Sequence, residues 1–358
     1  MIWLPAAVTY RCGHSAAVRE SLESHKQGIW AVCEGCAMKV AICGLGDMGM
    51  VHFETLAALE DTVVVAAADP DPDKAARARN RGIRVYPAAE EMIGEIKADC
   101  VSIATPTSSH ARLAIRALER GMDVFCEKPL ARTFEEGVAM VRAAQKARKL
   151  LGAGYVLRFH DAYRLAREMA RGGRLGQIGT VRTSRCAHLS APWHRDVEAN
   201  GGATFELLTH DLDWLSWTLG PVRRVFARGL ARGKKTVERD YTLAVLRFAD
   251  GTIGHLEGSL AEAGEFYAAY EIAGDAGLLA YDTRRAATLE ARLMTAEGVE
   301  TLSEAPQAVR PFVRQMRSFA QALAGGAPYE VSGEAALPAL RLAEAVYESV
   351  QTGSRVEV

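Results

Sequence analysis

The stretch VAICGLGDMG places three glycines directly after a short apolar run, and it constrains the fold more than any other feature of the chain. Val40 to Gly44 has the pattern of a buried parallel strand, and Gly44, Gly46 and Gly49 follow with the spacing G-x-G-x-x-G. The first glycine permits a tight turn, the second lets a pyrophosphate approach the backbone, and the third allows the helix to pack closely on the strand. The stretch therefore predicts a dinucleotide-binding strand–turn–helix unit.

A second apolar run, TVVVAAAD, ends in Asp69, at the distance where such units place an acidic residue. A carboxylate there accepts hydrogen bonds from the adenosine ribose hydroxyls and repels a 2′-phosphate. The adjoining DPDPDK carries no basic residue next to Asp69, although Lys74 and Arg77 follow one to two turns later. NAD is therefore the expected cofactor, and NADP is less favoured.

The order of the predicted elements indicates an α/β protein. Strand-like and helix-like stretches alternate over residues 38–150, which predicts a doubly wound parallel sheet. Two helical stretches follow, at about 161–174 and 203–219, and long strand candidates lie between 180 and 274. Several long strands in succession predict an α+β domain with a large, open and mostly antiparallel sheet.

The length of 358 residues is comfortable for two domains. We expect a Rossmann domain over residues 38–157 and a second domain, for substrate binding and oligomerisation, over 158–358. Residues 1–37 form an extension outside this plan.

Charge and cysteine content exclude several classes of protein. The chain has 43 Lys and Arg against 44 Asp and Glu, which argues against nucleic acid as a partner. No apolar run is long enough for a membrane span, and the first residues lack the basic region of a signal peptide. Of seven cysteines, Cys43, Cys100 and Cys126 lie in apolar runs, which favours a reduced, cytoplasmic compartment over a disulfide framework.

The extension carries two close pairs of possible metal ligands, Cys12 with His14 and Cys33 with Cys36. Four such ligands suit tetrahedral zinc, and the segment resembles small bacterial zinc-ribbon modules with TYxCGH and a later CxxC. So short a piece with little apolar content would need a metal to fold. Two alternatives stay open, namely an upstream start codon and a leader whose cysteines are incidental.

Four motifs make the chain similar to the family of glucose–fructose oxidoreductases, inositol dehydrogenases and rhizopine-catabolism proteins. They are GLGDMG (44–49), ATPTSSH (104–110), CEKPLA (126–131) and GGATFELLTHDLDWL (201–215). The resemblance covers about residues 38–358. It implies a substrate that lies between the two domains over the nicotinamide, and an open sheet face that forms a homo-oligomer.

Oxidation of an alcohol delivers a hydride to the nicotinamide and a proton to a base. Lys128, in the Glu-Lys-Pro turn just past a strand, is expected to polarise the reacting oxygen. Glu206, His210 and Asp213 are spaced i, i+4 and i+7, on one face of a helix, so His210 is the expected base. A carboxylate one turn away would raise the pKa of His210.

The family usually has Asp where this chain has Glu206, so Glu206 is expected to contact a substrate hydroxyl or Lys128 and to influence substrate choice. Asp213 is expected to orient His210 or a nearby arginine. Arg158 matches a family arginine near the substrate, with a salt-bridged arginine as the alternative. Trp193 lies in a polar loop that would close over a sugar ring, or in an interface.

The predicted contacts form three sets. The expected cofactor-binding residues are Gly44, Leu45, Gly46, Asp47, Met48, Gly49, Asp69, Thr105, Pro106, His110, Glu127 and Lys128. The expected catalytic residues are Lys128, His210 and Glu206. The expected substrate-binding residues are Arg158, Trp193, Glu206 and Asp213.

The leading functional expectation is an NAD-dependent dehydrogenase of a sugar, cyclitol or related polyol. One alternative is a glycosidase-like enzyme that retains NAD and uses it transiently, without net oxidation. Another is a non-catalytic ligand-sensing regulator on the same fold. The presence of both Lys128 and His210 disfavours the regulator.

Overall fold

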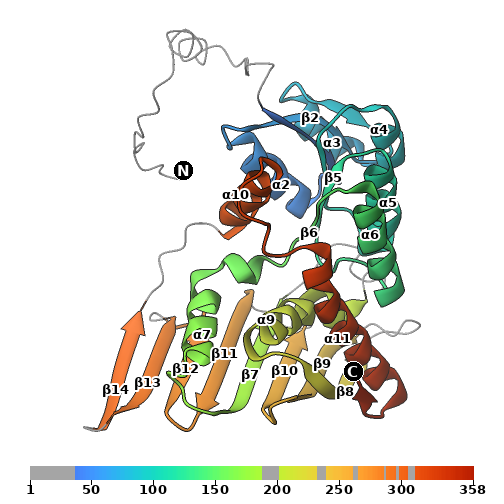
Figure 1. Cartoon of the computed structure of the whole chain (residues 1–358). Helices are drawn as coiled ribbons and strands as arrows, with labels where there is room; N and C mark the ends of the chain where they lie inside the picture. Colours follow the sequence, from blue (N-terminus) through green and yellow to red (C-terminus); the bar gives the residue numbers. More distant parts are fainter. Residues whose placement is uncertain are drawn as a thin grey trace, which may run out of the picture. The chain divides into compact units, whose positions relative to one another are not determined.

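The structure is a computed structural model that describes residues 37–187, 201–231, 239–260, 265–285, 288–295, 298–304 and 311–358. Trp193 and the four candidate zinc ligands of the extension lie outside these ranges. Met38–Val358 forms one compact unit that contains two sheets (Figure 1).

The first sheet is parallel and has six strands in the order β3-β2-β1-β4-β5-β6. The strands are β1 (Met38–Cys43), β2 (Thr62–Ala68), β3 (Arg84–Tyr86), β4 (Cys100–Ile103), β5 (Asp123–Cys126) and β6 (Leu151–Ala153). The chain reverses its direction of winding between β1 and β4, and ligands of such sheets bind at the carboxyl ends of the strands at this point. This confirms the predicted Rossmann fold.

Helices cover both faces of this sheet (Figure 1). They are α2 (Asp47–Ala57), α3 (Pro72–Arg79), α4 (Ala89–Glu95), α5 (His110–Glu119) and α6 (Phe134–Ala147). Local sequence explains where several begin: Asp71 caps α3, and Thr133 with Glu136 forms a capping box at the start of α6. Helix α10 (Pro311–Leu323), from the far end of the chain, packs against α2.

The second sheet has nine strands in the order β14-β13-β12-β11-β7-β10-β9-β8-β15, and only the β7–β10 pair is parallel. The strands are β7 (Ile178–Cys186), β8 (Val222–Ala231), β9 (Arg239–Phe248), β10 (Ile253–Ser259), β11 (Tyr267–Gly274), β12 (Gly277–Asp282), β13 (Leu289–Thr295), β14 (Gly298–Glu304) and β15 (Val356–Glu357). The mostly antiparallel character is as predicted. The strand candidates ended at residue 274, however, so the sequence interpretation missed β12 to β15.

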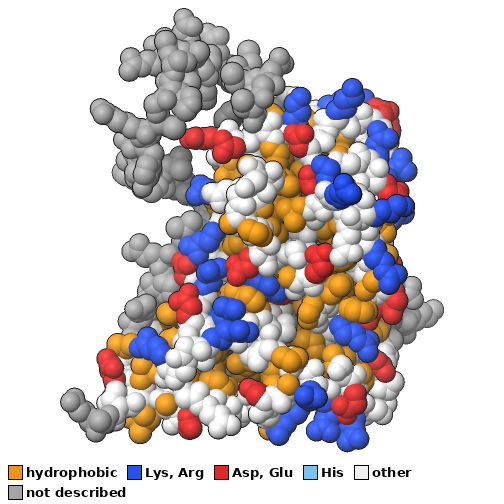
Figure 2. All heavy atoms as spheres, in the orientation of Figure 1, with side chains coloured by type: hydrophobic (Ala, Val, Ile, Leu, Met, Phe, Trp, Pro, Cys, Tyr) orange, Lys and Arg blue, Asp and Glu red, His pale blue; other side chains and the backbone are white. Residues whose placement is uncertain are grey.

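Helices α7 (Asp161–Arg171), α9 (Thr209–Leu219) and α11 (Gly333–Thr352) lie on one face of this second sheet (Figure 1). Side chains alternate accordingly: on β8, Val225 and Ala227 are buried, whereas Phe226 and Leu230 are exposed. Charged side chains of both signs are scattered over the face of the molecule drawn in Figure 2. Among the described residues, no helix is long and apolar enough to cross a membrane.

Candidate active site

The glycine loop between β1 and α2 has the geometry that a dinucleotide requires. Gly44 has a φ of +88°, and a Cβ there would collide with the backbone of Ala104. A Cβ on Gly49 would collide with the carbonyl of Gly44. Gly46, in contrast, has no atom of the described part of the chain within 4 Å of the place of its missing Cβ, so the backbone is open there to an approaching phosphate.

The first turn of α2 is also free to receive an anion. Gly46 is its N-cap, and no side chain of the described residues caps the helix. The first N–H groups of a helix lack partners within the helix and attract phosphate. Two of the three glycines are thus needed to form the turn, and the third keeps it accessible, which fits a bound pyrophosphate.

Asp69 lies at the end of β2 and is buried. Its Oδ2 accepts a hydrogen bond from the backbone N–H of Leu45 at 2.7 Å, and its Oδ1 accepts one from the N–H of Asp71 at 2.9 Å. The carboxylate therefore holds the glycine loop against β2. Each oxygen has a further lone pair, which is the capacity needed to bind two ribose hydroxyls.

Lys128 follows β5 in the Glu-Lys-Pro turn, at the carboxyl edge of the parallel sheet. Its Nζ donates to the backbone oxygen of Glu206 at 3.0 Å and lies 3.4 Å from Oε2 of the same residue. The Lys128 side chain is 15 % exposed and that of Glu206 is 9 % exposed, so the ion pair is largely shielded from water. The structure thus brings the lysine and the glutamate together, as expected.

His210 lies in the first turn of α9, directly after a π-helical segment over Thr204–Leu208. Its side chain is half-buried, and Nδ1 is buried without a hydrogen-bond partner in the described part of the chain. Burial and the positive charges of Lys128 and Arg185 hold the pKa of His210 well below its ordinary value.

The expected upward shift of the His210 pKa is therefore wrong. A π turn is wider than an α turn, so Glu206 and His210 do not stack as an i, i+4 pair of an α-helix does. The Glu206 carboxylate is directed at Lys128 instead. Two cations remain close to the imidazole, and both oppose its protonation.

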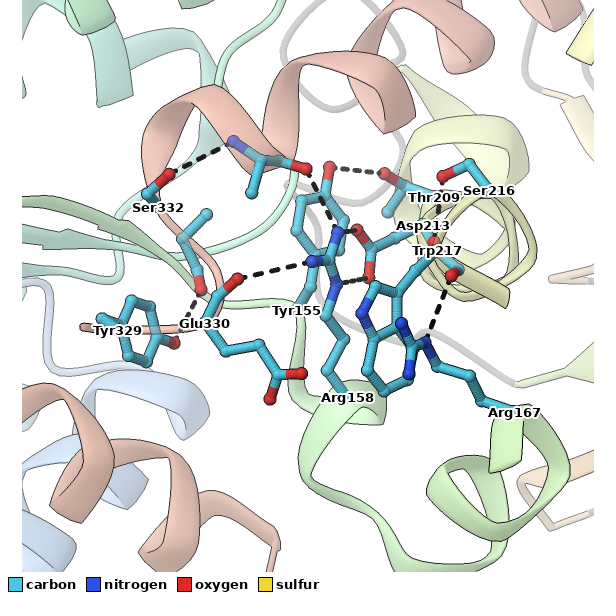
Figure 3. Close-up of polar contacts among 12 residues, drawn as sticks. Tyr155, Arg158, Arg167, Thr209, Asp213, Ser216, Trp217, Tyr329, Glu330 and Ser332 are labelled. Carbon is cyan, nitrogen blue, oxygen red and sulfur yellow. Dashed lines mark hydrogen bonds and ion pairs between the residues drawn. The ribbon is translucent and has the colours of Figure 1, made fainter. Parts of the chain in front are cut away.

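Two buried arginine–aspartate pairs anchor α9 on either side of this region. Arg185, from β7, binds Asp211 through two hydrogen bonds of 2.8 and 3.0 Å. Arg158 binds Asp213 through two hydrogen bonds of 2.9 and 2.6 Å (Figure 3). Such bidentate pairs fix orientation because the guanidinium and the carboxylate are both planar.

Arg158 also donates to the backbone oxygens of Glu330 and Ala335, at 3.4 and 3.1 Å (Figure 3). The polar groups of Arg158 and Asp213 are directed at one another and at the backbone, and their expected role in substrate binding stays a prediction. The geometry matches the salt-bridged alternative for Arg158, and Asp213 orients an arginine and not His210.

Two of the expected cofactor-binding residues, His110 and Glu127, make hydrogen bonds within the protein. His110 is buried, with Nδ1 3.0 Å from the carbonyl of Pro129 and Nε2 2.8 Å from the carbonyl of Thr105. Glu127 is buried and lies 2.9 Å from Nε2 of His52. Thr105 and Pro106 remain in the loop after β4, where Thr105 Oγ1 lies 2.6 Å from Ser109 Oγ.

The sequence interpretation missed His52 and Arg185. His52 lies three positions after Gly49 on α2, where a fully buried polar side chain needs partners. Arg185 lies within a strand candidate, and an arginine there reads as solvent-exposed unless its partner on another element is known.

Comparison with known proteins agrees with this geometry. The family model "Oxidoreductase family, NAD-binding Rossmann fold" of the Gfo/Idh/MocA group matches residues 38–155, and the Gfo/Idh/MocA C-terminal domain matches 163–280. The fold and the glycine loop therefore define an NAD-binding oxidoreductase. The chain belongs to the Gfo/Idh/MocA oxidoreductase family.

Relatives of known activity extend over nearly the whole chain. Myo-inositol 2-dehydrogenase of Thermotoga maritima is 27 % identical, and the match covers 90 % of this chain and 98 % of the relative. The rhizopine catabolism protein MocA of Rhizobium meliloti is 30 % identical, covering 87 % and 94 %. A levoglucosan dehydrogenase, solved in complex with NADH and L-sorbose, has a TM-score of 0.81 and 25 % identity, covering 90 % and 99 %.

Proposed function

We propose that this protein is an NAD-dependent dehydrogenase that oxidises a secondary alcohol of a sugar, cyclitol or related polyol, with Lys128 and His210 as its catalytic residues. The observation that carries the proposal is the Lys128–Glu206 ion pair at the carboxyl edge of the Rossmann sheet. His210 is close enough to Lys128 for the charge of the lysine to lower the pKa of the imidazole. The inositol and levoglucosan dehydrogenases among the relatives support a polyol or sugar as substrate.

The residues divide the chemistry between them. NAD, when bound along the glycine loop, supplies the acceptor for the hydride. The ammonium of Lys128 donates a hydrogen bond to the reacting oxygen and stabilises the negative charge that develops there. His210 accepts the hydroxyl proton, and because Nδ1 is buried, Nε2 is the nitrogen that we assign to this step.

Glu206 holds Lys128 in place from both its backbone oxygen and its carboxylate. The ion pair still leaves Lys128 further N–H groups for the substrate, since an ammonium has three donors. The Glu206 carboxylate lies beside the Lys128 ammonium, so it can accept a hydrogen bond from a substrate hydroxyl next to the one that Lys128 contacts. We propose Glu206 as a residue that selects the substrate, and Arg158 with Asp213 as positioning residues for α9.

The test is a screen of cyclitols, sugars and anhydrosugars with NAD, followed by NADH absorbance and by product analysis. Stoichiometric NADH with a ketone product supports a dehydrogenase. Product without net NADH indicates the glycosidase-like alternative. Tight binding of a sugar with no turnover of any substrate indicates the ligand-sensing regulator and contradicts the proposal.

We further propose that the chain forms a homo-oligomer through the open face of the second sheet. Phe226, Leu243 and Ile253, from the neighbouring strands β8, β9 and β10, are 41 %, 41 % and 36 % exposed. Exposed apolar side chains grouped on one surface are typical of protein interfaces. Sedimentation of the purified protein tests this, and a monomer at micromolar concentration contradicts it.

We also propose that the protein is located in the cytoplasm.

The division of the chain into 38–157 and 158–358, and a structural zinc on the extension 1–37, also remain our proposals. Among the described residues, no group of three or more His, Cys, Asp and Glu is arranged to hold a metal. The zinc proposal therefore depends only on the sequence spacing of its four ligands, Cys12, His14, Cys33 and Cys36. Trp193 also remains a proposed substrate contact, and this proposal likewise depends only on the sequence.

A further inference from the structure

His52 is a buried histidine to which the proposed chemistry assigns no role. It lies on α2, the helix that follows the glycine loop, and none of its side chain is exposed. Its Nε2 lies 2.9 Å from Oε1 of Glu127, and its Nδ1 lies 2.8 Å from the hydroxyl oxygen of Ser102. Three elements meet here, since Ser102 belongs to β4 and Glu127 follows β5.

The carboxylate of Glu127 fixes the direction of the bond that it makes with His52. A carboxylate only accepts, so Nε2 of His52 donates to Glu127. In a neutral imidazole Nδ1 is then an acceptor, and the hydroxyl of Ser102 donates to it. The second oxygen of Glu127 accepts the backbone N–H of Lys128 at 3.0 Å. The chain of bonds therefore runs from β4 through His52 and Glu127 to the backbone of Lys128.

The Glu127 carboxylate has little freedom to move within this chain. It is buried, and a Cβ added to Gly154 would lie 3.0 Å from both of its oxygens, so Gly154 forms one wall of its site. The ring of His52 packs edge-on against Phe125, with 5.4 Å between the ring centres. The bond to His52 and the charge of Lys128 hold the pKa of Glu127 below its ordinary value despite burial.

We propose that His52 is a positioning residue for Lys128, acting through Glu127. This inference rests on the proposed role of Lys128 in catalysis. The bond from Glu127 fixes the backbone of Lys128 from one side, and Glu206 fixes its ammonium from the other. Because His52 is on the helix whose first turn would receive the dinucleotide, one helix would serve both the cofactor site and the catalytic lysine.

Two substitutions separate the two bonds of His52. In His52→Gln, the amide nitrogen takes the place of Nε2 and can still donate to Glu127. In His52→Asn, the shorter amide takes the place of Nδ1, so the contact with Ser102 survives and the bond to Glu127 is lost. Both variants are uncharged and polar, which makes each the control for the other.

We expect His52→Asn to lower kcat by about 10²-fold, the order of loss for a catalytic group displaced by about 1 Å. His52→Gln should restore kcat to within a few-fold of the unaltered protein. The dissociation constant of NAD, measured by tryptophan fluorescence, should change little in either variant. Ser102→Ala, which leaves the bond to Glu127 intact, should also retain kcat.

Equal losses of kcat in the Gln and Asn variants, in step with their melting temperatures, would show a merely structural role and overturn the inference. Normal turnover in His52→Asn would do the same. If His52→Asn does not fold, Glu127→Gln provides the second test, because it keeps the volume and weakens both bonds; unchanged kcat there also overturns it. Lys128→Ala, assayed in parallel, separates this failure from a failure of the proposed role of Lys128, which is overturned if Lys128→Ala turns over normally.

Discussion

The ammonium of Lys128 lies 3.0 Å from the backbone oxygen of Glu206 and 3.4 Å from its carboxylate, although 78 positions separate the two residues. The lysine comes from a turn at the edge of the parallel sheet, and the glutamate from a π turn that leads into α9. The contact therefore joins the cofactor-binding sheet to the helix that carries His210. The N–H groups of Lys128 that Glu206 does not use can donate to an alcohol oxygen.

Replacement of Lys128 or His210 by Ala is expected to lower kcat strongly and to leave NAD binding nearly intact. The reason is that both act on the alcohol and not on the dinucleotide. Loss of a general base typically costs about 10²–10⁴-fold in rate. Stopped-flow measurement of NADH formation, with NAD affinity determined separately, checks this. Near-normal turnover of His210→Ala would remove His210 from the mechanism.

The oxidation rate is expected to rise with pH below about 6.5, as His210 loses its proton. At neutral pH the titration of His210 is complete and no longer changes the rate. Only neutral imidazole accepts a proton, and the pKa of His210 is held well below its ordinary value by burial and by Lys128 and Arg185. The pH profile of kcat/KM checks the midpoint. In an NMR titration of Lys128→Met, loss of one cation should move the His210 pKa upward; a downward shift would contradict the electrostatic argument.

Asp69→Ala is expected to narrow the preference for NAD over NADP, because the carboxylate that repels a 2′-phosphate is gone. Asp69 also holds the N–H groups of Leu45 and Asp71, so part of the loss will be common to both cofactors. Asp69→Asn, which keeps a hydrogen-bond acceptor without the charge, is the matched control. Equal binding of NAD and NADP by the unaltered protein would refute the assignment.

Asp213→Asn is expected to destabilise the fold by about 3–5 kcal/mol, since it leaves Arg158 as a buried charge without its counter-ion. Arg158→Met should cost a similar amount, because burial then raises the pKa of an unpaired Asp213 further. Chemical denaturation measures both. If instead either variant unfolds normally and only its KM for the sugar rises, the pair contacts substrate as first predicted.

Zinc analysis of the full chain is expected to find about one metal per chain, lost when Cys33 and Cys36 become Ser. A chain that starts at Met38 should retain its dehydrogenase activity, because the glycine loop, Lys128 and His210 all lie beyond that point. Absence of zinc from freshly purified protein would leave the cysteines incidental.

Much of the fold could be predicted because it depends on local patterns. The glycine spacing requires a tight turn, and the structure shows that Gly44 and Gly49 have no room for a side chain. Alternating strand and helix patterns define the parallel sheet. Strand β14 escaped prediction because it lies at the edge of the second sheet, where little burial is needed and polar residues are frequent.

The sequence by itself determined the cofactor-binding unit and the identity of the candidate catalytic residues, since these depend on short spacings. Only the tertiary structure decided their partners. It directs Glu206 to Lys128 and pairs Arg158 with Asp213. It also brings His52 within hydrogen-bond distance of Glu127. Each of these contacts joins residues at least 55 positions apart, and the π turn before His210 shifts the helix register. The physical reason is that burial and neighbouring charge, which set the pKa of His210, are properties of the packed chain and not of any local pattern.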